Sequence, residues 1–348
     1  MSIKISENIP LGPLTTLGVG GPARYFTEAA SEEELLSANG FARDRGLEIF
    51  ILGGGSNLLV ADNGFDGLVI KMALRGVDLS PPYHGNVIVK AAAGEEWDSL
   101  VEMCVDRGLA GFECLSGIPG LVGATPIQNV GAYGQEVSQT IVEVRCIDRE
   151  SLEPITLSNS ECGFAYRTSI FNTTHRGRYI VTGVTYQLTD GGSPFLEYRD
   201  LKERFAGQTP SLVEARRAVL EIRREKSMVI DNADPNSRSA GSFFKNPIVR
   251  RERTDEITEA IGETVPFFPM PDGSVKVPAA WLIERAGFSK GYILGNAGIS
   301  QNHSLAIINR GGASADDVVA LKDMIRHAVF SRFEIELVPE PVFLGFGG

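Results

Sequence analysis

Hydrophobic and polar positions follow two different periods along this chain, and they predict helices and strands in mixed order. Residues 31–45 open with Ser-Glu-Glu-Glu and continue with apolar side chains at Leu35, Leu36 and Phe41, which predicts a capped amphipathic helix. Apolar runs bounded by turn residues predict strands at residues 47–52, 67–71, 86–90, 141–147, 179–188 and 305–309. Helical spacing predicts further helices at residues 97–108, 211–226, 254–261, 278–285 and 314–333. The mixed order predicts an α+β fold.

The segment 111–137 interrupts this periodicity. It is rich in glycine, contains two prolines and has little charge, so it cannot form a regular helix or an ordinary paired strand. Glycine allows positive φ and close approach of a ligand, and successive N–H groups can form a concavity suited to a diphosphate. A loop-rich connection without any ligand explains the composition almost equally well.

A second glycine cluster, Gly53 to Asn57, follows the predicted strand 47–52 and favours the ligand interpretation. A strand that leads into three glycines and then Ser-Asn is typical of a phosphate-binding loop, although the G-x-G-x-x-G spacing and the Walker lysine are absent. Two glycine-rich loops in one chain could hold a long cofactor from two sides. An extended dinucleotide such as FAD would fit.

Three polar residues stand in unusual surroundings. Arg167 lies among aromatic and apolar residues, and it is either a surface charge with a buried stem or a buried cation kept for an anion. Ser242 lies between Gly241 and two phenylalanines, where a purely structural hydroxyl bonded to a carbonyl is the alternative. Glu340 lies between two prolines, which enforce extended backbone and interrupt the strand there.

The predicted helix 211–226 is basic. Thr209 and Pro210 suggest a cap and a first-turn proline before it. We expect most of its arginines to form a solvated face: Arg216, Arg217, Arg223 and Arg224. Lys226 is a better candidate for binding phosphate, because the chain turns there into a polar loop.

Composition limits the classes of function. With 348 residues, 43% hydrophobic and 22% charged, the chain is an ordinary globular protein of two or three domains. It has neither a signal-peptide core nor an apolar run of the roughly 18 residues that a membrane helix needs, so we expect a cytoplasmic protein. The net charge of −11 argues against general nucleic-acid binding. The cysteines are scattered, which favours buried thiols over zinc ligands or disulfides: Cys104, Cys114, Cys146 and Cys162.

Six motifs in the same order make the chain resemble the UDP-N-acetylenolpyruvoylglucosamine reductase family. They are residues 16–21, 53–57, 116–134, 166–167, 241–247 and 339–340. The resemblance runs from about residue 8 to residue 345 and implies a two-lobed FAD-binding domain of the vanillyl-alcohol-oxidase (PCMH) type, followed by an α+β substrate-binding domain. The implied boundaries are 1–72 and 73–226 for the FAD-binding lobes, 227–335 for the substrate-binding domain, and 336–348 for a C-terminal segment that carries the catalytic glutamate and returns to the FAD-binding part. Residues 196–201, with Tyr198, resemble the extra loop of the longer subgroup of the family.

The resemblance also implies the reaction. Hydride passes from NADPH to non-covalently bound FAD and then to the enolpyruvyl group of the UDP-sugar, which gives UDP-N-acetylmuramate for peptidoglycan synthesis. Arg167 would bind the substrate carboxylate, Glu340, if protonated, would donate a hydrogen bond to it, and Ser242 would protonate the carbanion. The enzyme would work as a monomer on a UDP-sugar and NADPH, without a metal, a nucleic acid or a membrane.

The remaining site residues are implied in the same way. The expected cofactor contacts are Gly53, Gly54, Gly55, Ser56, Asn57, Ser116, Gly117, Gly123, Ala124, Gln128 and Gly131. Tyr198, Lys226 and Asn246 match positions that hold the diphosphate and uridine end of the substrate, and His303 is either a substrate contact or an ordinary core or surface histidine. One departure is Pro341, where the family usually has valine after the catalytic glutamate, and it brings the local hydrogen bonding into question.

Two rival functions use the same fold. An oxygen-using oxidase often attaches its flavin covalently through histidine or cysteine, and Cys114 is the only cysteine near a glycine-rich loop. A flavin-binding protein without catalysis would be expected to lose Arg167, Ser242 or Glu340, and all three are present.

Overall fold

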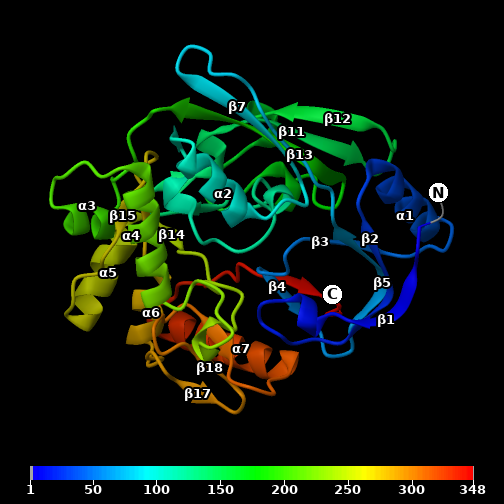
Figure 1. Ribbon diagram of the computed structural model, residues 1–348. Helices are drawn as coiled ribbons and strands as arrows, with labels where there is room; N and C mark the ends of the chain where they lie inside the picture. The colour runs from blue at the N-terminus through cyan, green and yellow to red at the C-terminus, as the bar shows by residue number, and fades with distance from the viewer. Residues whose placement is uncertain (1–2, 348) are drawn as a thin grey trace. The chain divides into compact units, whose positions relative to one another are not determined.

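The computed structural model describes residues 3–347, and the chain forms two compact units (Figure 1). Unit 1 comprises the described part of Met1–Ile9 together with Ala23–Gly55 and Asp66–Val229. Unit 2 comprises Pro10–Pro22, Ser56–Phe65 and the described part of Ile230–Gly348. Two short N-terminal segments therefore belong to the same unit as the C-terminal part of the chain.

The helices of unit 1 begin at side-chain caps where the sequence offers one. They are α1 (Glu32–Arg43), α2 (Trp97–Asp106), α3 (Arg199–Phe205) and α4 (Leu212–Glu225). Ser31 caps α1 by accepting the N–H of Glu34 at 3.2 Å, which confirms the predicted start. The predicted cap of α4 at Thr209 is wrong. Ser211 caps this helix, because Glu214 three residues later completes a capping box.

A large antiparallel sheet in unit 1 contains the predicted strands at residues 86–90, 141–147 and 179–188. Its strand order is β12 (Pro154–Ser158), β11 (Ile141–Asp148), β13 (Tyr179–Asp190), β7 (Asn86–Ala92) and β6 (Val77–Leu79), with β8 (Leu109–Ala110) also paired to β13. Figure 1 shows α2 beside this sheet, and the rings of Trp97, Phe112 and Tyr186 pack against one another there, all at most 1% exposed. This core supports the glycine-rich segment 111–137, which forms only short 3-10 turns and two-residue strands.

A smaller sheet leads into the first glycine cluster. Its strand order is β1 (Ser6–Pro10), β2 (Pro22–Ala29), β5 (Phe65–Met72) and β3 (Ile49–Leu52). Strands β3 and β5 are parallel, with Ile49 opposite Leu68, and both were predicted as apolar runs. Because β3 ends at the buried Leu52, the cluster that begins with Gly53 forms the loop directly after this strand.

Unit 2 has its own core around α7 (Ala315–Phe333). Val318, Leu321, Ile325 and Val329 recur at helical spacing and are at most 1% exposed, so one face of α7 is buried. The other elements are α5 (Arg251–Ile261), α6 (Ala279–Arg285), the sheet β14 (Ile248–Val249), β16 (Val275–Lys276) and β15 (Phe268–Pro269), and the sheet β17 (Ile293–Leu294), β18 (Ala297–Ile299) and β19 (Ile307–Asn309). The C-terminal strand β20 (Val342–Leu344) pairs in parallel with β4 (Leu58–Val60), which belongs to the same unit. Among residues 3–347, the helices are too short or too polar to cross a membrane.

Candidate active site

The two glycine-rich loops meet in unit 1. A Cβ atom added to Gly54 would lie 2.7 Å from the Cα of Gly120, so the loops touch backbone to backbone and only glycine fits at this contact. Gly55 and Gly117 both have positive φ, 63° and 70°. The loops therefore form one glycine-lined region in which the backbone can come close to a ligand such as FAD.

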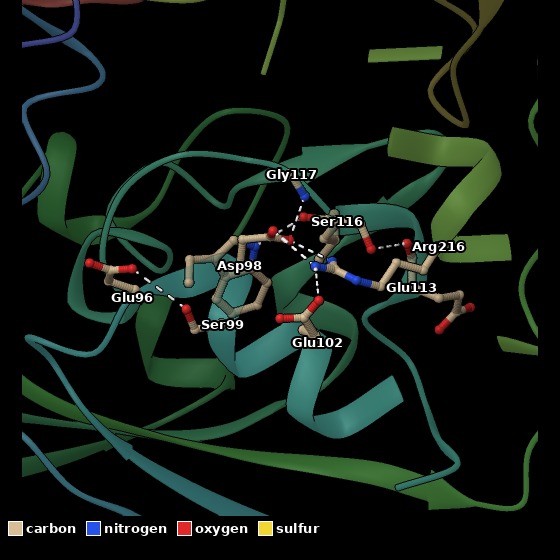
Figure 2. Close-up of polar contacts among 10 residues, drawn as sticks. Glu96, Asp98, Ser99, Glu102, Glu113, Ser116, Gly117 and Arg216 are labelled. Carbon is tan, nitrogen blue, oxygen red and sulfur yellow. Dashed lines mark hydrogen bonds and ion pairs between the residues drawn. The ribbon is translucent and has the colours of Figure 1, made fainter. Parts of the chain in front are cut away.

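A partly buried ion pair holds the second loop in place (Figure 2). The N–H of Gly117 donates to Oδ1 of Asp98 at 2.6 Å, and Arg216 donates to both oxygens of the same carboxylate at 2.6 and 3.0 Å. The neighbouring Ser116 is fully buried, and its hydroxyl donates to the carbonyl of Glu113 at 2.7 Å. Burial of Asp98 opposes its charge, but the hydrogen bonds from Arg216 and Gly117 hold its pKa below the ordinary value.

The solvated basic face expected on α4 is therefore wrong for two of its four arginines. Arg216 and Arg223 are each 7% exposed, whereas Arg217 and Arg224 lie at the surface. Arg223 donates to the carbonyl of Met228 at 2.7 Å, and its burial lowers the pKa of the guanidinium. The two buried arginines are seven residues apart, which places them on one helix face, but Arg217 and Arg224 have the same spacing, so the sequence does not distinguish the buried pair from the exposed one.

The rest of the glycine-rich segment shows why glycine is needed and which groups come near it. A Cβ atom on Gly123, within the 3-10 turn Val122–Ala124, would lie 2.5 Å from the Cβ of Ala93. Gly131 accepts a hydrogen bond at its carbonyl from Nη2 of Arg167 at 2.9 Å. Arg167 has a positive φ of 54° and is partly buried. The structure thus brings one predicted catalytic residue to the predicted cofactor segment, which also contains Gln128.

Ser242 and Glu340 lie on two paired extended segments of unit 2. The N–H of Glu340 donates to the carbonyl of Phe243 at 2.9 Å, the N–H of Lys245 donates to the carbonyl of Val338 at 3.0 Å, and an isolated β-bridge joins Phe244 to Pro339. Main-chain pairing therefore places the serine segment beside the glutamate segment. The Oγ of Ser242 is 3.2 Å from Nε2 of His303, a contact in which the tautomer of the histidine decides the donor.

Pro341 fits the local hydrogen bonding, which resolves the question raised by the sequence. The N–H groups of Glu340 and Val342 donate to the carbonyls of Phe243 and Asn57, both at 2.9 Å. Nδ2 of Asn57 donates to the carbonyl of Glu340 at 3.3 Å. Asn57, predicted as a cofactor contact, therefore also fixes the backbone on either side of residue 341, and the proline between the two donors is accommodated in the extended chain.

The predicted diphosphate-binding residues of unit 1 form a cluster of aromatic and charged side chains. Nζ of Lys226 is 2.9 Å from Oδ2 of Asp200 and 5.9 Å from the ring centre of Tyr133. The rings of Tyr133 and Tyr198 pack edge to face at 5.2 Å. Burial opposes the charge of Lys226, but its hydrogen bond to Asp200 raises the pKa of the ammonium above the ordinary value.

Asn246, the residue of unit 2 that is predicted to bind the diphosphate and uridine end of the substrate, makes a hydrogen bond within the fold. Oδ1 of Asn246 accepts the N–H of Ala279 at 2.9 Å, at the start of α6. The sequence did not predict the contacts of four residues near the candidate site, because the partner of each is distant in the chain. These residues are Asp98, Arg216, Asp200 and Tyr133.

All four cysteines are buried thiols, as predicted. Burial raises the pKa of Cys104 and Cys162 to about 12. The pKa of Cys114 is also raised by burial, and its Sγ donates to the carbonyl of Phe195 at 3.0 Å. A thiol in that state is a poor nucleophile.

Comparisons with known proteins agree with the resemblance seen in the sequence. Residues 234–344 match the family described as UDP-N-acetylenolpyruvoylglucosamine reductase, C-terminal domain, and residues 23–151 match the FAD binding domain family. Proteins named UDP-N-acetylenolpyruvoylglucosamine reductase are 48% identical in Thermobifida fusca, over 99% of both chains, and 45% identical in Streptomyces coelicolor, over 97% of this chain and 90% of the relative. The crystal structure of the Thermus caldophilus enzyme of that name is similar with a TM-score of 0.67 and 27% identity, over 98% of both chains. The predicted fold class is thereby confirmed.

Proposed function

The chain belongs to the UDP-N-acetylenolpyruvoylglucosamine reductase family, and from that premise we propose how its residues divide the work of the reaction. The protein is an FAD-dependent oxidoreductase of peptidoglycan precursor synthesis. It uses NADPH to reduce the enolpyruvyl group of UDP-N-acetylenolpyruvoylglucosamine and forms UDP-N-acetylmuramate. Our proposal concerns which residues bind the cofactor, stabilise the developing charge and supply the proton.

The glycine-rich region of unit 1 is the proposed binding site for FAD. The contact between Gly54 and Gly120 and the positive φ of Gly55 suit a loop whose backbone approaches a diphosphate closely. FAD, when bound, accepts hydride from NADPH and passes it to the substrate. We propose that the flavin is held without a covalent bond, because burial raises the pKa of Cys114 and disfavours its thiolate.

Arg167 and Glu340 are proposed to stabilise the charge that hydride addition creates. Hydride addition at the carbon remote from the carboxylate leaves negative charge on the adjacent carbon, and this charge delocalises into the carboxylate. The planar guanidinium of Arg167 can donate two parallel hydrogen bonds to that group. Glu340, if protonated, can donate one more. Fixed donors aimed at developing charge are a large source of catalysis in sites that exclude water.

Ser242 is proposed to donate the proton that completes the reduction. A serine is a weak acid in water, but a strongly basic enediolate within hydrogen-bond reach can take its proton. The observation that carries this assignment is the main-chain pairing of the serine and glutamate segments, in which Glu340 N–H donates to the carbonyl of Phe243, next to Ser242. The contact with His303 at 3.2 Å supports a role in orienting the serine hydroxyl.

Tyr198, Lys226 and Asn246 are proposed to bind the diphosphate and uridine end of the substrate. The ammonium of Lys226 has an aromatic and an acidic neighbour, and a diphosphate carries more negative charge than the single carboxylate of Asp200 with which it would compete.

We also propose the lobe boundaries given above and membership of the longer subgroup with Tyr198. We propose that the protein is a monomer and that it acts in the cytoplasm without membrane or nucleic-acid partners. Sedimentation of the purified protein tests the monomer.

Two variants test the charge-stabilising residues. In anaerobic stopped-flow experiments, Arg167→Lys and Glu340→Gln should keep reduction of the flavin by NADPH but slow its reoxidation by the enolpyruvyl sugar by roughly a hundredfold or more. Arg24→Lys and Glu336→Gln, at exposed ion pairs, are the matched controls and should leave both rates unchanged. Unchanged reoxidation in either site variant would reject the role of that residue.

A further inference from the structure

The backbone of Arg167 is held in a left-handed conformation that residues with a side chain rarely adopt. It lies in the irregular segment between Ala165 and the 3-10 turn Ile170–Asn172, and its φ of 54° is uncommon for a residue with a side chain. Backbone in this region is strained for a residue with a side chain and persists only where the surroundings impose it. The surroundings of Arg167 therefore show what fixes its guanidinium.

Three side-chain hydrogen bonds join the arginine segment to residues 127–131 of the glycine-rich stretch. Ser169 Oγ donates to the carbonyl of Ile127 at 2.6 Å. Asn129 Nδ2 donates to the carbonyl of Ala165 at 3.1 Å, and Arg167 Nη2 donates to the carbonyl of Gly131 at 2.9 Å. The three contacts involve residues 127, 129 and 131, so they fasten the arginine segment at three points of a stretch that begins as a turn, with Asn129 at a φ of 45°. We call these contacts the arginine clamp.

The two uncharged members of the clamp are buried and fully engaged. Ser169 is 0% exposed, and its Oγ also accepts the N–H of Phe171 at 3.2 Å. Asn129 is 1% exposed, its Nδ2 also donates to Oε2 of Glu136 at 2.8 Å, and its Oδ1 accepts the N–H of Ser138 at 3.1 Å. Buried polar groups engaged in this way move little, because any shift leaves one of them unsatisfied.

We propose that Asn129 and Ser169 are positioning residues that set the place of the Arg167 guanidinium relative to the cofactor segment. This inference rests on the proposed role of Arg167 as the ligand of the substrate carboxylate. Catalysis by a preorganised charge depends on where the charge lies, and a displacement of about 1 Å can lower the rate about a hundredfold. The two side chains would thus affect the reaction without touching the substrate.

The test combines each variant with a change at Arg167. Ser169→Ala and Asn129→Ala, in holoenzyme with bound FAD, should slow anaerobic reoxidation by the enolpyruvyl sugar by about 10-fold to 100-fold. In the Arg167→Lys background the same substitutions should slow it less than about threefold, because the guanidinium they position is absent. Ser169→Thr, which keeps the hydroxyl, should restore most of the wild-type rate.

A binding measurement separates positioning from general destabilisation. Calorimetry should show weaker binding of UDP-N-acetylmuramate to Ser169→Ala, by about fivefold to tenfold, and unchanged binding of UDP, which lacks the carboxylate. Thr254→Val is the matched control: it removes a buried hydroxyl that donates at 2.7 Å to the carbonyl of Arg251, in unit 2, and should change neither affinity.

The outcomes distinguish this inference from the function on which it rests. If Arg167→Lys leaves reoxidation unchanged, the role of Arg167 is wrong and the positioning role falls with it. If Arg167→Lys slows reoxidation but Ser169→Ala and Asn129→Ala act equally in both backgrounds, or weaken UDP and product binding alike, Arg167 keeps its role and the positioning role is rejected. Should Asn129→Ala fail to fold, the Ser169 series decides the question.

Discussion

The predicted catalytic residues of the two units are held in opposite ways. In unit 1, side-chain hydrogen bonds from Ser169 and Asn129 fasten the segment of Arg167 to residues 127–131. In unit 2, main-chain hydrogen bonds join the segments of Ser242 and Glu340. The N–H of Glu340 donates to the carbonyl of Phe243, and the N–H of Lys245 donates to the carbonyl of Val338. Main-chain pairing depends little on which side chains are present, whereas a side-chain clamp is lost with a single hydroxyl or amide. The two halves should therefore respond differently to substitution.

The largest loss of stability is expected where a substitution disturbs the backbone of unit 2, on which the pairing of the two segments depends. Gly345 follows β20 and has a φ of 80°, and a Cβ atom there would lie 1.9 Å from the carbonyl oxygen of Gly64. Gly345→Ala should lower the free energy of unfolding by about 3 kcal/mol, since it adds a clash to a strained conformation. Denaturant unfolding measures the change. Gly347→Ala is the control, because the space around that Cβ is open, and equal stability of the two variants would contradict the account.

The next largest effect is expected where a side chain supports the cofactor loop of unit 1. Asp98→Asn should lower the free energy of unfolding by about 2 kcal/mol at neutral pH, because the amide cannot form the ion pair with Arg216. The exposed pair of Arg24 and Asp66 offers a control, and Asp66→Asn should cost less than about 0.5 kcal/mol.

The pH dependence of the Asp98 effect has a defined sign. The pKa of Asp98 is below its ordinary value in the folded protein, so the charged carboxylate stabilises the fold fully above that ordinary value of about 3.9. This stability is lost as the pH falls from there through the folded pKa. The gap between wild type and Asp98→Asn should thus be widest near neutral pH and close in strong acid, and a gap that widens in acid would refute the assignment.

The smallest effect is expected from the contact between the side chains of Ser242 and His303 in unit 2. His303→Gln should slow reoxidation of the flavin by the enolpyruvyl sugar by about tenfold at most, because the hydrogen bond at 3.2 Å orients a hydroxyl that the backbone already places. His327→Gln, on the exposed surface of α7, is the control. A loss as large as that from removing Ser242 would assign His303 a direct role.

What the sequence could predict depends on how far each interaction reaches along the chain. The cap of α1 by Ser31 was predicted, since serine and glutamate lie three residues apart. The burial of Arg216 was not, because its partner Asp98 is 118 residues away and nothing local distinguishes it from the exposed Arg217. The bond between Arg167 and Gly131 spans 36 residues, and both ends were predicted only as separate features.

The glycine-rich loops and the catalytic candidates illustrate the same limit. Glycine marks close approach without naming the partner, so the contact of Gly54 with Gly120 could not be derived from composition. Motif order identified the family because six short motifs together are specific, although each is weak alone. The roles of Arg167, Ser242 and Glu340 stay predictions that kinetics must decide.

The most direct measurement of the central claim is the pair of half-reactions of Ser242→Ala under anaerobic conditions. NADPH should reduce the flavin within about twofold of the wild-type rate, because no proton from Ser242 is needed in that step. Reoxidation by UDP-N-acetylenolpyruvoylglucosamine should be slower by about a thousandfold, the scale of losing a general acid. If both half-reactions proceed at wild-type rates, Ser242 is not the proton donor and the proposed division of the reaction is wrong.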